Sequence, residues 1–154
     1  FLISVLSIND GSAALGFTIF SICMFAMRLM GDRISFKYGP SKTARYSGLV
    51  ALIGSIILLT FESFFPLLIG FGLIGLGIAV IIPLAFSRAG NDKNISQGTA
   101  IASIATLGYG GMLIGPLFIG LIAQATSIKT SFLIFPILAF LIFALSKHLS
   151  IKSA

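Results

Sequence analysis

The charged side chains of this sequence gather in one stretch, where a single acid lies among five bases. Around Asp32 stand Arg28, Arg33, Lys37, Lys42 and Arg45. A carboxylate beside guanidinium and ammonium groups forms charge-assisted hydrogen bonds and ion pairs, which can hold two surfaces together and release them. The same basic residues can also anchor a membrane protein in one orientation, so two interpretations are open at this point.

Outside that stretch, no group of residues in the sequence suits catalysis or metal binding. Cys23 is the one cysteine and lies in an apolar run, where we expect it to act as a small hydrophobic residue. His148 is the one histidine and stands beside Lys147, and the sequence has no HExxH pattern. We therefore expect no enzyme activity, no metal and no cofactor.

The composition identifies the environment that these residues must work in. Of 154 residues, 57% are hydrophobic and 9% are charged, whereas soluble domains carry about 25% charged residues. A soluble protein of this size could not hide so much apolar surface from water. This excludes most cytosolic enzymes, nucleic-acid binders and secreted disulfide modules. We interpret the net charge of +6 as a topology signal.

Five apolar stretches are long enough to cross a bilayer, which takes about 20 residues of helix. We expect helices over residues 12–30, 45–62, 65–87, 98–124 and 130–148. Residues 1–8 are apolar but too short to cross, so we expect them to end a helix that begins before Phe1 and this chain to be a fragment. The expected fold class is all-α: a polytopic bundle of transmembrane helices.

The basic residues also predict the orientation of the bundle. All ten Lys and Arg residues except Lys129 fall in segments on one side of the membrane. Cytoplasmic segments carry an excess of Lys and Arg, so we expect the loop over residues 31–45 and the C-terminus to be cytoplasmic. Asp32 would then lie at the end of a helix, where the macrodipole disfavours an acid, so we expect a partner to hold it.

Many of the 17 glycines lie inside the expected spans, and small residues decide where helices pack in lipid. In the span 98–124 the packing and hinge candidates are Gly108, Gly111, Gly115, Pro116 and Gly120, with Gly111 and Gly115 as a GxxxG pair. The span 65–87 contains Gly70, Gly72, Gly75 and Gly77, and Pro83 near its end. These residues favour either packing alone or two bundles that rock against each other.

Three segments together resemble the major facilitator superfamily. Gly31-Asp32-Arg33, followed by Gly39, Lys42 and Arg45, is similar to the signature loop that this family carries between the second and third helices of each half. Residues 77–90 resemble the family's tenth helix, and residues 108–120 resemble its glycine-rich eleventh helix. The similarity looks closest to a sugar-permease-like, uncharacterised branch of bacterial inner-membrane proteins.

This resemblance implies the C-terminal half of a 12-helix transporter. Residues 1–8 would end helix seven, the five full spans would be helices eight to twelve, and the N-terminal six-helix half would be a partner absent from this chain. Such a protein is a secondary active transporter that moves a small-molecule substrate across the lipid bilayer of the bacterial inner membrane by alternating access. It has no nucleic-acid partner.

The resemblance also implies roles for individual residues. A cytoplasmic gate would be formed by Gly31, Asp32, Arg33, Gly39, Lys42 and Arg45. Within it, Asp32 would be a latch against a helix N-terminus of the other half, where free N–H groups attract an acid.

The substrate cavity would be lined by few polar side chains. The candidates are Asp10, Ser21, Ser103, Thr106 and Tyr109, although Ser and Thr in a span can instead bond back to their own helix. The span 65–87 has no side chain more polar than glycine between Leu67 and Phe86. We expect an apolar or weakly polar substrate, or recognition mainly by helices outside this chain.

A second class of function stays open beside transport: a polytopic membrane scaffold or assembly partner that transports nothing. A six-span half with its own Gly-Asp-Arg segment encoded upstream would favour transport, and a soluble domain there would favour the scaffold.

Overall fold

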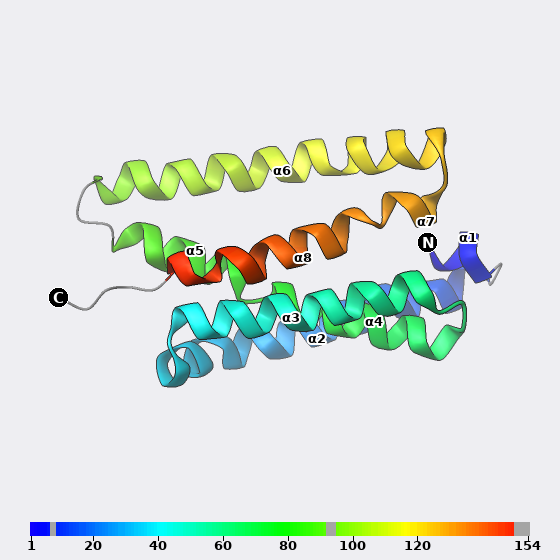
Figure 1. Ribbon diagram of the computed structural model, residues 1–154, viewed down its shortest axis with the longest axis horizontal. Coiled ribbons are helices and arrows are strands. Elements are labelled where there is room, and N and C mark those ends of the chain that lie inside the picture. The colour runs from blue at the N-terminus through cyan, green and yellow to red at the C-terminus, as the bar shows by residue number, and fades with distance from the viewer. Residues whose placement is uncertain (7–8, 92–94, 150–154) are drawn as a thin grey trace.

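The part of the chain that the structure describes is a bundle of helices. The computed structural model describes residues 1–6, 9–91 and 95–149, and the regular elements in these ranges are all helical (Figure 1). In chain order they are α1 (Leu2–Leu6), α2 (Asp10–Tyr38), α3 (Pro40–Thr60), α4 (Phe64–Ile78), α5 (Ile81–Gly90), α6 (Gln97–Ala125), α7 (Ile128–Ser131), α8 (Ile134–Leu145) and the short 3₁₀ helix η1 (Ser146–Leu149).

Five helical segments of the described chain are long and apolar enough to cross a membrane, which confirms the expected number. They are Gly11–Tyr38, Pro40–Thr60, Phe64–Gly90, Gln97–Ala125 and Ile128–His148. Side-chain caps fix where three of these segments begin, because they satisfy backbone donors that a helix start leaves free. Asn9 accepts a hydrogen bond from the Ser12 amide at 2.8 Å, and Ser96 and Ser127 cap α6 and α7 in the same way.

The basic stretch is helical, which corrects the expected loop over residues 31–45. α2 continues to Tyr38 and α3 starts at Pro40, so Gly39 alone separates them. Gly39 has a φ of 85°, which glycine adopts without strain, and Pro40 takes the first helical position, where its missing N–H is not needed. Lys and Arg are good helix formers, so the charges lengthen both helices and the Gly-Pro pair makes the turn.

Two prolines each interrupt a span. One span consists of α4 and α5 with a break at Ala79, and the last consists of α7 and α8 with a break at Phe132. Each break lies four residues before a proline, Pro83 or Pro136. The proline ring crowds the carbonyl of the residue at the break, and proline has no N–H to donate to that carbonyl. Pro116 differs, because α6 continues through it without interruption.

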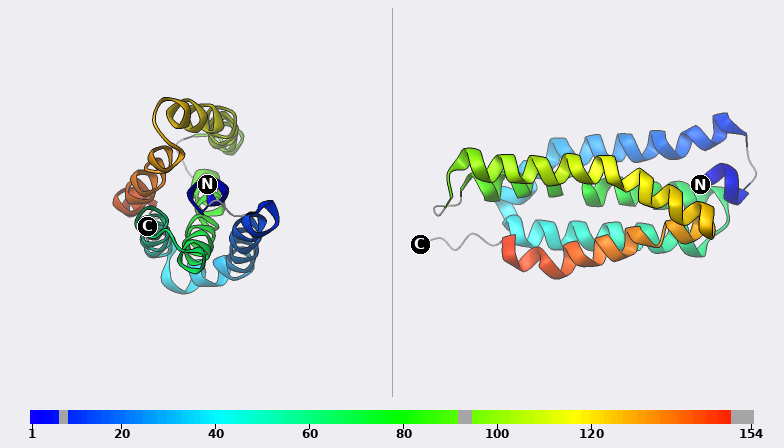
Figure 2. Two further views of the ribbon diagram at one scale, coloured as in Figure 1. Left: turned by 90° about the vertical axis from the view of Figure 1, so that its right-hand side faces the viewer. Right: turned by 90° about the horizontal axis from the view of Figure 1, so that it is seen from above.

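Glycines bring the central helices close together. α4 packs against both α2 and α3, and α8 packs against α3 (Figure 2). A methyl group on Gly54 would lie 2.8 Å from the carbonyl oxygen of Gly70, and one on Gly77 would lie 2.5 Å from the backbone nitrogen of Ala51. No side chain fits at such distances, so these glycines allow α3 and α4 to pack backbone to backbone.

α6 lies apart from this packed group, on one side of the molecule (Figures 1 and 2). Its contacts are mainly with its neighbours in sequence, α5 and α7. Leu107 and Leu113 are 77% and 79% exposed. A methyl group at Gly108, Gly111, Gly115 or Gly120 would meet no atom within 4 Å. The close packing expected of the Gly111 and Gly115 face is therefore absent within the described part of this chain.

Candidate functional site

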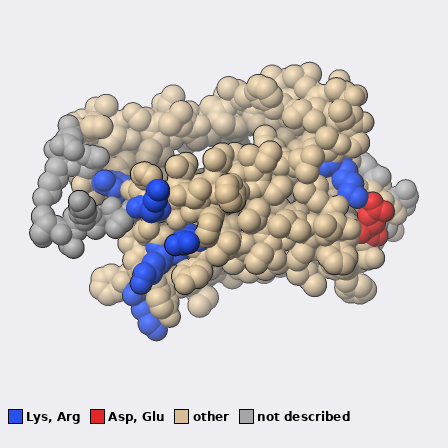
Figure 3. All heavy atoms as spheres, viewed as in Figure 1, with Lys and Arg blue, Asp and Glu red and all other residues tan. Residues whose placement is uncertain are grey.

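The charges divide the molecule into two unlike ends. Lys and Arg side chains gather near the end where α2 turns into α3, which we call the basic end, and an acidic and a basic side chain lie together at the opposite end (Figure 3). The basic end carries the Gly39 turn and the end of α5, and the opposite end carries the turn between α3 and α4. The expected gate residues all belong to the basic end.

Asp32 lines a groove at the basic end, against the junction of α4 and α5. The groove has a volume of about 290 Å³ and is lined by Arg28, Gly31, Asp32, Ser35, Phe36, Pro40, Val80, Pro83, Leu84 and Ser87. Gly31 is buried against the side chain of Val80, so a larger residue there would push α2 away from the junction. Thus the candidate latch and the candidate hinge at Pro83 line the same groove.

Asp32 is exposed, and the structure places no ion pair to it within residues 1–6, 9–91 and 95–149. α2 extends well past Asp32 to Tyr38. The helix dipole acts within the last turn, so the expected repulsion of Asp32 by its own helix end does not apply. Lys37 is the basic residue in that last turn, and its positive charge suits the negative end of the helix dipole.

The remaining gate candidates do not meet in one cluster. Arg45 turns toward α8, where its guanidinium carbon lies 4.8 Å from the centre of the Phe143 ring. Such a cation–π contact attaches the basic end of α3 to α8. Arg33 and Lys42 are exposed at the surface, and Gly39 forms the turn itself. Only Gly31 and Asp32 share the groove at the α4–α5 junction.

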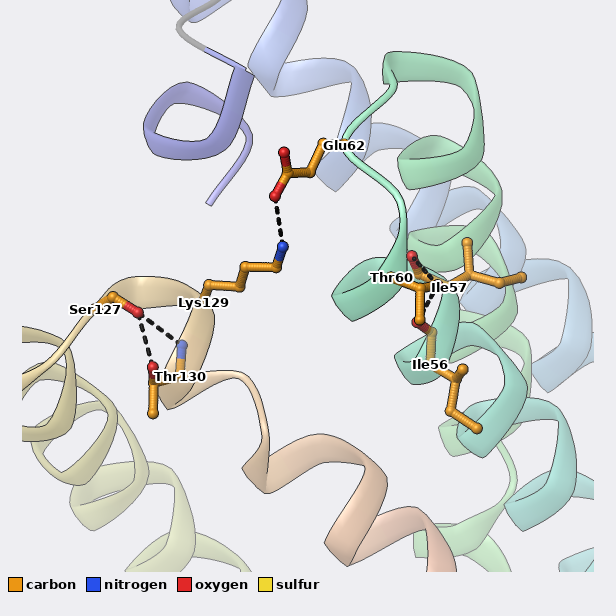
Figure 4. Close-up of polar contacts among 7 residues, drawn as sticks. All are labelled: Ile56, Ile57, Thr60, Glu62, Ser127, Lys129 and Thr130. Atoms are coloured by element: carbon orange, nitrogen blue, oxygen red, sulfur yellow. Dashed lines mark hydrogen bonds and ion pairs between the residues drawn. The ribbon is translucent and has the colours of Figure 1, made fainter.

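An ion pair that the sequence analysis did not anticipate lies at the opposite end. The ammonium group of Lys129, in α7, donates a hydrogen bond to Oε1 of Glu62 at 2.6 Å (Figure 4). This hydrogen bond and the charge of Lys129 lower the pKa of Glu62 below its ordinary value. The two residues are 67 positions apart, so the pair joins the α3–α4 turn to the start of the last span. Their shared place on the less basic side was the only sign in the sequence.

The substrate-cavity candidates do not converge within this chain. Ser103 and Thr106 are exposed on α6 and donate hydrogen bonds to the carbonyls of Thr99 and Ala102 at 2.9 and 2.8 Å. This is the bonding to their own helix that the sequence left open. Tyr109 is 70% exposed on the same helix, whereas Ser21 is half-buried on α2. The side chain of Asp10 lies outside the described residues.

A large pocket of the described chain is apolar. It has a volume of about 540 Å³ and lies between α1, α2, α4 and the α7–α8 junction. Phe1, Phe71 and Phe132 are among its walls, and every lining residue is hydrophobic. It can therefore accommodate apolar groups but offers no side-chain hydrogen bond. Among the residues that the structure describes, no three His, Cys, Asp or Glu side chains lie where they could hold a metal ion together.

The sequence is similar to known membrane transporters. The family model of the Major Facilitator Superfamily matches residues 1–150. An uncharacterized transporter of Sinorhizobium fredii is 38% identical over 146 residues, which cover 95% of this chain and 39% of that protein. An uncharacterized MFS-type transporter of Yersinia pestis is 38% identical over 132 residues, which cover 86% of this chain and 34% of that protein.

A third relative is the membrane protein MosC of Rhizobium meliloti, which is 35% identical over 133 residues. The aligned part covers 86% of this chain and 33% of MosC. The chain thus spans between 33% and 39% of the length of these curated relatives. No solved structure gives a significant match to the chain.

Proposed function

Because the chain belongs to the major facilitator superfamily, we propose that the complete protein is a secondary active transporter that moves a small solute across the membrane by alternating access. In this proposal the chain supplies one helical bundle. A second bundle, in the part of the protein outside this chain, faces it across the substrate pathway.

The observation that carries this proposal is the exposure of α6. Ala100 is the only residue of this helix that is buried within the described chain. α6 nevertheless carries the glycine pair Gly111 and Gly115 and the hydroxyls of Ser103 and Thr106. Small residues suit helix–helix contact, and hydroxyls suit a polar neighbour, so neither is needed by a helix that faces lipid alone. A second bundle that moves against α6 accounts for both.

The substrate in this proposal is apolar or weakly polar. α4 and α5 present no polar side chain between Leu67 and Phe86, and this span lies at the centre of the packed bundle. Ser103 and Thr106 donate their hydroxyl protons to their own helix, but each oxygen can still accept a hydrogen bond from a solute. A strongly charged solute would find no counter-charge between Leu67 and Phe86 or along α6.

The basic end faces the cytoplasm in the proposed orientation, and the membrane is a bacterial inner membrane. The excess of Lys and Arg at that end supports this, because such residues stay on the cytoplasmic side. Labelling of Ser63→Cys and Asn91→Cys in a Cys23→Ser background tests it, since both positions are exposed and lie at opposite ends. An impermeant reagent added outside intact cells should modify position 63 alone. Modification of position 91 alone would reverse the orientation.

Asp32 acts as the latch of the cytoplasmic side in this proposal. Its carboxylate is exposed, has no ion-pair partner within the described residues, and lines the groove beside Pro83. A free acid at this place is available to N–H groups at a helix start of the second bundle. Because the same groove includes the α4–α5 junction, release of the latch and bending at the junction can occur together.

Flux through the complete protein tests the function. Proteoliposomes would be loaded with a panel of apolar and weakly polar solutes, with and without an imposed proton gradient, and compared with protein-free liposomes. We expect saturable, protein-dependent flux of at least one solute and a response to the gradient. Correctly inserted protein that moves none of the solutes would favour a membrane scaffold instead.

A further inference from the structure

A second groove at the basic end lies between α2 and α3, away from Asp32. It has a volume of about 360 Å³, within the range of small-molecule sites. Its lining residues come from α2, α3 and α4: Met27, Ile34, Tyr38, Thr43, Tyr46, Ser47, Val50 and Leu76. No charged side chain lies among them, so the interior of the groove suits a hydrocarbon chain.

The interior of this groove offers few polar atoms to a ligand. The Thr43 hydroxyl donates to the carbonyl of Gly39 at 2.9 Å. Ser47 is buried, so its hydroxyl adds little polar surface to the groove. A polar ligand would therefore gain little from the groove interior, whereas an apolar one would lose nothing.

The mouth of the groove has the opposite character. Tyr38 and Tyr46 are 54% and 64% exposed and present rings that carry a hydroxyl. Tyrosine favours the boundary between lipid and water, where its ring is apolar and its hydroxyl is wet. The ammonium group of Lys37 lies 5.2 Å from the centre of the Tyr38 ring, and exposed Lys42 precedes Tyr46 by one helical turn. The mouth is positive and aromatic.

The groove is long enough to hold much of one acyl chain. Along α3 its lining extends from Thr43 to Val50. Seven residues of helix correspond to about 10 Å at 1.5 Å per residue. One leaflet of the hydrocarbon core is about 15 Å thick, so the groove covers roughly two thirds of a leaflet.

From this combination we infer that the groove between the basic ends of α2 and α3 is a binding site for an anionic phospholipid. One acyl chain lies in the groove against Ile34, Val50 and Leu76. The phosphate lies at the mouth, where Lys37 and Lys42 attract its charge and the hydroxyls of Tyr38 and Tyr46 can donate to its oxygens. Tight binding requires both the acyl chain and the anionic headgroup of the lipid. This distinguishes the site from a general attraction of anions to a basic surface.

Native mass spectrometry of the complete, purified protein tests this site. The probes are phosphatidylglycerol and phosphatidylcholine of the same chain length, and soluble glycerol phosphate as the headgroup without a chain. We expect phosphatidylglycerol to bind more tightly than phosphatidylcholine and glycerol phosphate not to bind. Equal affinity for the two lipids, or binding of glycerol phosphate as tight as that of the lipid, would overturn the inference.

Two sets of variants test the contacts to the lipid headgroup and the contacts to the acyl chain separately. A basic residue at the membrane surface contributes about fivefold to the binding of an anionic lipid, so Lys37→Gln with Lys42→Gln should weaken phosphatidylglycerol about thirtyfold and phosphatidylcholine little. Lys147→Gln, at the same end but outside the groove, is the matched control. An equal loss in the control would show a general surface effect and contradict the site.

The second set fills the groove. Val50→Phe places a ring where the acyl chain lies and should weaken both lipids. Ile53→Phe adds the same ring to the same helix at a position that is 52% exposed and does not line the groove. We expect this control to bind both lipids as the unmodified protein does. If Val50→Phe binds both lipids as before and its thermal stability is unchanged, the acyl chain does not lie in this groove.

Discussion

Glu62 and Lys129 are far apart in the sequence, and a hydrogen bond of 2.6 Å between their side chains joins the α3–α4 turn to α7 at one end of the bundle. The bond lowers the pKa of Glu62, so the folded state favours the carboxylate more than the unfolded state does. The stabilisation is therefore fully present above the ordinary pKa of 4.5. It is lost as the pH falls through the lower pKa of the folded state.

Glu62→Gln, Lys129→Gln and the double variant should reveal this pH dependence. We expect each single change to lower the melting temperature of the detergent-solubilised protein slightly at neutral pH, because exposed ion pairs contribute little. The two effects should not add, since either change breaks the same bond. Below the pKa of folded Glu62 the coupling should vanish. A coupling of equal size at both pH values would show that the carboxylate charge is not involved.

The sequence could place these two residues on the same side of the membrane but could not pair them. The side of the membrane on which a residue lies is predicted by counting the charges between spans, which is local information along the chain. Pairing depends on how the α3–α4 turn and α7 approach each other in space. The same limit applies to Arg45, whose contact with Phe143 requires α8 to pack against α3.

At the scale of the helices, the Gly39-Pro40 pair sets the boundary between α2 and α3, and the charges around it do not. The number of spans follows from apolar length, and the sequence predicted it correctly. The predicted loop over residues 31–45 was wrong, because Lys and Arg are good helix formers and the turn needs only Gly39 and Pro40. Pro83 was predicted as a hinge, and the structure interrupts the helix four residues before it, at Ala79.

Pro83→Ala should close the break between α4 and α5. The new amide at position 83 can donate to the carbonyl of Ala79 and remove a helix defect of up to about 3 kcal/mol. We expect slower hydrogen exchange around residues 79–84 and slower transport, because the junction beside Asp32 becomes stiffer. Pro66→Ala is the matched control, since Pro66 lies in the first turn of α4, where no helical hydrogen bond is lost. Faster exchange in Pro83→Ala would contradict a proline-made break.

Two glycine substitutions distinguish contacts inside the chain from contacts outside it. Gly77→Leu places a side chain against the backbone of α3 at Ala51, so we expect a destabilisation of roughly 1–3 kcal/mol and a low yield of folded protein. Gly115→Leu meets no atom within 4 Å in the described chain. It should lower the folded yield of the complete protein only if a helix outside this chain packs on α6. A fully stable Gly115→Leu variant would mean that this face of α6 meets lipid.

At the scale of the whole molecule, the sequence indicated the family and the all-α fold but not the arrangement of the helices. A membrane span can be predicted from its own residues, because each span must satisfy its own backbone hydrogen bonds in lipid. Packing is not local: the glycines of α4 meet partners within the chain, and those of α6 do not. A glycine-rich span looks alike in both cases, so the sequence named the glycines of both spans as packing candidates but could not tell which of them meet a partner within this chain.

Alternating access of the complete protein, with Asp32 as the latch of the basic end, is the central claim. Asp32→Asn removes the charge from an exposed position and should leave folding unchanged. A charge-assisted contact that is shielded from water contributes enough to shift a two-state equilibrium about tenfold or more. The loss of that contact should therefore favour the state that is open at the basic end. Asp32→Glu keeps the carboxylate and serves as the control.

The most direct measurement is the accessibility of a cysteine on α6 from each side of the membrane. Thr106→Cys in a Cys23→Ser background would be reconstituted in oriented proteoliposomes and labelled with an impermeant thiol reagent applied to one side at a time. We predict labelling from both sides, with Asp32→Asn faster from the basic end and slower from the opposite end, and Asp32→Glu close to the parent protein. Identical rates in the parent and in Asp32→Asn, from both sides, would contradict the latch, and labelling of the parent from one side alone would contradict the alternation.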